Sequence, residues 1–164
     1  MDRELAKLQK ALASAIADMD LDDLTRHPEG KWSAAQILEH LNLTYIGTIK
    51  NFERCLASGK SAVDPRPRKR WSRLLITRLG YFPSGGKSPP RVEPRGMPPQ
   101  QVKAEIVENI VRMESILREC ESHFGRRPIA SHPVFGAMTV SEWRKFHLVH
   151  GKHHAKQILR LRKS

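Results

Sequence analysis

Two histidines near the C-terminal end of the sequence have the spacing of a metal-binding pair. His150 and His154 are four residues apart, so on a helix they stand one turn apart on the same face and can share one ion. His40 lies on the apolar stripe of another predicted helix, between Ile37 and Leu41. Three inward imidazoles from two helices would form a site for a divalent metal such as zinc, nickel or iron. The pattern therefore predicts His40, His150 and His154 as metal ligands.

A site of this composition suits catalysis. Three protein ligands leave coordination positions for water or substrate, whereas structural sites are usually closed by four protein ligands. Neutral imidazoles also leave the full charge on the ion, which lowers the pKa of a water or a thiol that it contacts. The expected chemistry is therefore activation of water or of a thiol.

The spacing alone leaves another interpretation open, in which these are core histidines without a metal. A zinc-protease motif is excluded, because the position after the first histidine of the pair is Gly151 and not the glutamate that acts as base. His147 lies one turn before His150 and is a candidate general base, a further ligand, a residue that orients the ligands, or a packed histidine. His153 is predicted to face away from this stripe, toward solvent or a hydrogen-bonding partner.

Four amphipathic helices must position these histidines. Apolar residues recur at steps of three and four over residues 3–19, from Ser33 to about Gly59, after Pro98 and Pro99 as far as Phe124, and from Thr139 onward. Ser33 with Gln36, and Thr139 with Glu142, form capping boxes. Residues 20–31 and 126–138 are predicted loops, and no strand alternation is visible. The pattern predicts an all-α four-helix bundle in one domain, residues 1–164.

The connection between the second and third long helices, about 59–98, is long, basic and rich in proline. Residues 64–99 contain eight of the 11 prolines and nine Lys or Arg against two acids. Residues 71–82 have the pattern of a short helix, and the rest is a predicted loop. A connection of this length permits a crossover, so neighbouring helices can run parallel. Its charge favours a small anionic substrate near the site.

Composition narrows the function classes further. The chain has 164 residues and a net charge of +12, with no run of 18 apolar residues and no apolar signal segment, so neither a membrane span nor a secretory signal is expected. Two cysteines cannot form a disulfide framework, which favours the cytoplasm. The basic charge suggests nucleic acid, but the sequence has no helix-turn-helix, zinc-finger or RNA-binding signature. A nucleic-acid-binding module is therefore the weaker alternative.

Two blocks of the sequence resemble a known family. The segment 31–41 is similar to the second-helix signature of the DinB-like metalloprotein superfamily. The run from His132 to Gly136, followed by residues 139–143 and 147–158, is similar to its last helix, with features of the branch described as DUF1569 and of bacillithiol transferases. The resemblance implies a bundle with a long crossover, a metal held by His40, His150 and His154, and a homodimer.

The same resemblance bears on activity. Characterised members include thiol-dependent transferases and isomerases in which the metal activates a low-molecular-weight thiol. We therefore expect a metal-dependent enzyme, transferase-like or hydrolase-like, that activates a low-molecular-weight thiol or water and acts on a small-molecule substrate. The alternative is a metal-binding bundle without catalysis, acting as a sensor.

Overall fold

A computed structural model describes residues 1–63 and 88–162. Four long helices dominate it, together with one short helix, one 3₁₀ turn and one hairpin. In chain order they are α1 (Arg3–Ile16), α2 (Leu21–Thr25), α3 (Ala34–Ser58), η1 (Pro90–Val92), α5 (Pro99–Phe124), β1 (Ala130–His132), β2 (Gly136–Met138) and α6 (Val140–Leu161). The predicted four-helix bundle is confirmed. The short helix predicted at 71–82 lies outside the described residues.

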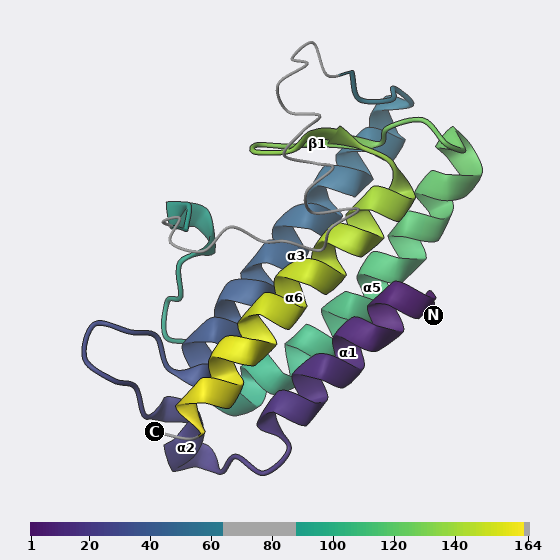
Figure 1. The fold of residues 1–164 in the computed structure, drawn as a ribbon. Helices are drawn as coiled ribbons and strands as arrows, with labels where there is room; N and C mark the ends of the chain where they lie inside the picture. The colour runs from purple at the N-terminus through teal and green to yellow at the C-terminus, as the bar shows by residue number, and fades with distance from the viewer. Residues whose placement is uncertain (64–87, 163–164) are drawn as a thin grey trace.

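The long helices pack as two parallel pairs. α1 lies along α6 and α3 lies along α5 (Figure 1). Ion pairs near both ends of the first pair fix its direction, because Glu4 contacts Lys145 and Asp18 contacts Arg162. In the second pair, the Asn42 amide donates to Glu105 and the Glu53 carboxylate binds Arg112. Consecutive long helices α3 and α5 can run parallel only because the connection between them returns the chain to the starting end of the bundle.

Both helices that carry the candidate ligands begin at the predicted capping boxes. The Ser33 amide donates to Gln36 Oε1 over 2.9 Å, and the Gln36 amide donates to Ser33 Oγ over 3.2 Å. At α6 the reciprocal bonds join Thr139 and Glu142, at 2.9 and 3.3 Å. Each box satisfies two amides of the first helical turn. The starting points of α3 and α6, and thus the faces that their histidines occupy, are set locally.

The apolar stripes form one core between the four long helices. All the stripe residues predicted for the third long helix are buried: Val102, Ile106, Ile110, Met113, Leu117, Cys120 and Phe124. Leu5, Leu8 and Leu12 of α1 join them from the opposite side. Among residues 1–63 and 88–162, no helix is both long and apolar enough to cross a membrane.

Two predicted loops contain regular structure. Asp20 caps the five-residue helix α2, its carboxylate accepting from the Asp23 amide over 2.8 Å. Residues 130–138 form an antiparallel hairpin in which Ala130 pairs with Met138. The expectation of loops without strands was wrong at these positions, because five-residue helices and three-residue strands are too short to show a period.

Candidate metal centre

The three predicted ligands meet between α3 and α6. Each offers a ring nitrogen, and these nitrogens lie within 4.8 Å of one another. The Nε2 atoms of His150 and His154 are 3.0 Å apart. All three side chains are buried, with 5–7% of each residue exposed. The structure therefore brings together the set that the two helical stripes predicted.

Hydrogen bonds fix the tautomers of two members of the cluster. His40 Nδ1 lies 2.9 Å from the carbonyl oxygen of Val92, and His154 Nδ1 lies 2.7 Å from Gln157 Oε1. Since these oxygens can only accept, each Nδ1 carries the hydrogen and each Nε2 keeps its lone pair. Gln157 Nε2 in turn donates to His153, so His153 is a hydrogen-bonding partner, one of the two roles predicted for it. Acceptors of this kind orient the histidine ligands of metal sites.

Burial keeps these imidazoles neutral. It lowers the pKa of His40, and it lowers the pKa of His154 to about 3, with the neighbouring His40 adding to the effect. Burial and the surrounding histidines place the pKa of His150 well below its usual value. Neutral imidazole is the form that binds a metal, so the cluster is ready to bind at neutral pH.

The spacing of His150 and His154 fits two ligands of one divalent ion. Nitrogen ligands of tetrahedral zinc lie about 2.0–2.1 Å from the metal, which places neighbouring ligand atoms roughly 3.3 Å apart. The 3.0 Å separation of His150 and His154 is close to that value. The donor set is made of imidazoles alone, which suits zinc, nickel and iron.

A buried carboxylate next to His40 supports the cluster from α3. Glu39 is 2% exposed, and its carboxylate accepts the backbone amides of Arg95, Gly96 and Met97 over 2.7, 3.1 and 3.1 Å. These bonds hold the end of the crossover against α3, which places the Val92 carbonyl over His40. Sequence reasoning assigned no role to Glu39. The available signal was an acid within the apolar run from Ile37 to Leu41.

His147 lies deeper in the bundle than the cluster. It has no exposed surface, and its ring packs against those of Tyr45, Trp143 and Phe146 at centroid distances of 5.0–5.8 Å. Among the residues that the structure describes, neither of its nitrogens has a hydrogen-bond partner. Burial, with a smaller effect of His132, lowers its pKa to about 3. A role as base or as an orienting residue stays a prediction.

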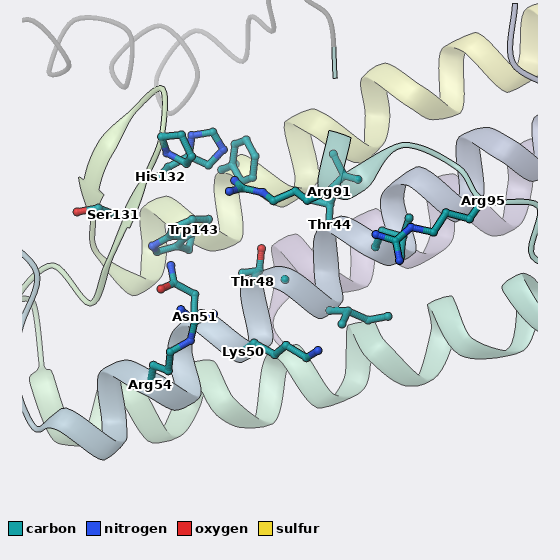
Figure 2. Close-up of a pocket in the computed structure, with 16 residues that line it drawn as sticks. Thr44, Thr48, Lys50, Asn51, Arg54, Arg91, Arg95, Ser131, His132 and Trp143 are labelled. Atoms are coloured by element: carbon teal, nitrogen blue, oxygen red, sulfur yellow. The ribbon is translucent and has the colours of Figure 1, made fainter. Parts of the chain in front are cut away.

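Two recesses flank the cluster along both helices. A basic recess of about 460 Å³ lies toward the hairpin, and Thr44, Val92 and Phe146 are among its lining residues (Figure 2). Two of these contact the clustered rings, because the Val92 carbonyl accepts from His40 Nδ1 and Phe146 stacks on His150. Thr44 Oγ1 donates to the backbone carbonyl of His40 within α3. A second recess of about 510 Å³ lies toward the ends of α2 and α6, lined partly by Trp32, Ile37 and Gln157.

Comparison with known families identifies the family of this sequence. The sequence pattern of the DinB superfamily matches residues 4–158. This chain belongs to the DinB superfamily. The match includes all three clustered histidines and both capping boxes, so the DinB resemblance read from two short blocks extends over nearly the whole described chain.

Relatives of this DinB protein carry names that refer to metal. A protein of Geobacillus thermodenitrificans named "Putative metal-dependent hydrolase" is 26% identical over 161 residues, covering 97% of this chain and 80% of the relative. A Bacillus cereus protein of the same name is 22% identical over 163 residues, covering 98% and 83%. Among solved structures, YfiT from Bacillus subtilis, described as "a probable metal-dependent hydrolase with an unusual four-helix bundle topology", matches with a TM-score of 0.62 and 21% identity, covering 98% of this chain and 83% of YfiT. That likeness supports the fold.

Proposed function

We propose that this DinB protein is a metal-dependent enzyme in which His40, His150 and His154 hold a divalent ion. The observation that carries the proposal is the convergence of three buried, neutral imidazoles, two of them with Nδ1 hydrogens already bound to acceptors. Histidines that served only packing would not need one ring nitrogen each within 4.8 Å of the others. The metal-dependent hydrolase names of the relatives support the same conclusion.

The protein's own residues prepare this site in three ways. Val92 and Gln157 accept the Nδ1 hydrogens of His40 and His154, which leaves the Nε2 lone pairs of both rings available to a metal. Phe146 stacks on His150 and Trp32 packs against His40, which limits the access of water to the ligands. The two recesses lie next to residues that contact the ligands, and they leave room for parts of a substrate there. A bound divalent ion would supply Lewis-acid chemistry, lowering the pKa of a water or a thiol that it contacts.

The proposed reaction is activation of water or of a low-molecular-weight thiol. The names of the relatives favour water and hydrolysis. The family resemblance favours a thiol and a transferase-like reaction. Zinc, nickel and iron all suit three imidazoles. A small-molecule substrate, a cytoplasmic location and a homodimer belong to the same proposal.

Elemental analysis of the purified protein tests the metal. Wild type should bind about one divalent ion per chain, and His40→Ala should lose it. His27→Ala is the matched control, because it removes an exposed imidazole outside the cluster. A wild-type protein that binds no stoichiometric metal under any loading condition would contradict the proposal.

A second assay tests the chemistry. The metal-loaded protein is incubated with ester, amide and alkylating substrates, with and without added thiols, and product formation is followed. Turnover that needs a thiol supports transfer, and turnover without one supports hydrolysis. A bound metal with no turnover, together with a large fall in melting temperature on metal removal, would favour the non-catalytic or sensor alternative. Metal-independent DNA affinity that falls steeply with salt would favour the nucleic-acid-binding module.

A further inference from the structure

The basic recess next to the histidine cluster has an unusual charge pattern. Four cations line it: Lys50 and Arg54 on α3, and Arg91 and Arg95 on the segment that crosses above α3 (Figure 2). None of the described lining residues is acidic. Within residues 1–63 and 88–162, none of the four cations forms an ion pair. Cations gathered around a concave surface attract an anion more strongly than the same charges spread over a convex one.

The α3 face that forms one wall of this recess has two features that disfavour a helix. Lys50 and Arg54 are four residues apart, and like charges at this spacing repel. Gly47 lies in the middle of the helix, where glycine costs roughly 1 kcal/mol relative to alanine. A side chain at Gly47 would meet no described atom within 4 Å, so packing of the described residues does not require glycine there. Local features that oppose the helix and have no packing reason are typical of functional surfaces.

The remaining polar groups of the recess suit an oxyanion. Thr48 and Asn51 lie on the same side of α3 and supply a hydroxyl and an amide donor. The planar guanidinium of arginine can bind a carboxylate or a phosphate through two parallel hydrogen bonds. Figure 2 shows Arg91 extending over the recess toward His132, opposite the side chains of α3.

We infer that the basic recess binds a carboxylate or phosphate group of the substrate, held by Lys50, Arg54 and Arg91 above an open floor at Gly47. The anionic group would then lie near the histidine cluster, since two residues that line the recess also contact clustered rings: Val92 contacts His40 and Phe146 contacts His150. That the anion is part of a substrate rests on the proposed function, whereas binding of the anion does not. The cations that recognise the anion then lie partly on α3, and not only on the proline-rich crossover.

Anion binding to the full-length protein tests the inference. The probes are inorganic phosphate and acetate, titrated separately and followed by NMR chemical shifts of the α3 amides and by calorimetry. Arg91→Gln and Lys50→Gln should each weaken binding of the preferred probe by roughly tenfold, the effect of one charge-assisted contact. Arg160→Gln is the charge-matched control, because Arg160 lines the other recess. Preference for phosphate or for acetate identifies which of the two groups the site accepts.

A second pair of variants tests the floor of the recess. Gly47→Leu should raise the melting temperature, because it removes a glycine from a helix, and should weaken anion binding at least fivefold by filling the recess. Ala57→Leu is the control, at an exposed position of α3 outside the recess. A stability gain with unchanged anion affinity would overturn the role of Gly47.

The two proposals fail in different ways. His40→Ala should lose metal and still bind the preferred anion within about twofold of wild type. A protein that binds anions without ever binding metal would contradict the proposed function and leave the inference standing. Wild-type anion affinity in both Arg91→Gln and Lys50→Gln, or an equal loss in Arg160→Gln, would overturn the inference even if the metal binds.

Discussion

Replacing Glu39 by glutamine should loosen the segment that orients His40. Glu39 is 2% exposed, and its carboxylate accepts hydrogen bonds from the backbone amides of Arg95, Gly96 and Met97. A glutamine has only one accepting oxygen. In either orientation of its side chain, its NH₂ group faces at least one of these three N–H donors, so at least one bond is lost.

The size of the effect follows from these three bonds. Hydrogen bonds to charged groups contribute about 1.5–3 kcal/mol each and neutral ones about 0.5–1.5 kcal/mol. Losing one bond and weakening two would cost roughly 3.5–6 kcal/mol. Arg95 and Gly96 are exposed residues, so water can replace part of these bonds. We expect a net loss of about 2–3 kcal/mol in the free energy of unfolding, or roughly 5–10 °C in melting temperature.

Urea unfolding of the metal-free protein measures the loss of stability, and competitive metal titration measures the loss of metal affinity. Because the Val92 carbonyl then no longer holds His40 Nδ1–H, metal affinity should fall about 10–100-fold. Glu93→Gln is the matched control, since it removes the same charge from an exposed position of the same segment. The reasoning is refuted if Glu39→Gln differs from Glu93→Gln by less than about 0.5 kcal/mol in unfolding free energy.

Three further perturbations test other contacts. Gly151→Ala should destabilise the protein by about 1–3 kcal/mol in thermal unfolding, because the added Cβ would overlap the buried Leu8 side chain. This loss is expected although alanine favours a helix more than glycine does. An unchanged stability would mean that α1 can shift away from α6. Gln157→Leu removes the acceptor of His154 Nδ1–H and should weaken metal binding about 10–100-fold in the same titration, whereas an unchanged affinity would show that His154 needs no acceptor. Burial lowers the folded pKa of His147 to about 3, so the unfolded chain binds a proton below about pH 6.5 that the folded chain does not. The free energy of unfolding should therefore have its full value above pH 6.5 and fall toward pH 3, by up to about 1.4 kcal/mol per pH unit from this residue. In urea unfolding of the metal-free protein, His147→Phe should show a shallower fall than wild type between pH 6.5 and 5. Equal slopes would contradict the lowered pKa of His147.

Long helices could be predicted from the sequence because each repeats its signal many times. α5 shows seven inward apolar residues over 26 positions, and α3 and α6 also carry capping boxes at their starts. The histidine cluster could be predicted for the same reason. His40, His150 and His154 lie on stripes that must face the core, and inward residues of packed helices can meet.

The supports of the cluster could not be predicted, because they are backbone groups far away in the sequence. His40 and Val92 are 52 residues apart, and a carbonyl acceptor leaves no mark on the residue type that carries it. The backbone amides that donate to Glu39 likewise cannot be recognised from the residue types that carry them. Lys50 and Arg54 resemble an ordinary solvated helix face until the segment containing Arg91 is placed opposite them.

The pairing of α1 with α6 has a consequence for how the chain is made. α1 is the first long helix to be synthesised, and the neighbour that it packs against most extensively is the last. Its apolar residues Leu5, Leu8 and Leu12 therefore stay without that partner until α6 has left the ribosome. Contacts of such sequence separation slow folding and expose apolar surface to aggregation in the meantime. His150 and His154 are on the same late helix, so the ligand set is completed only as the bundle closes.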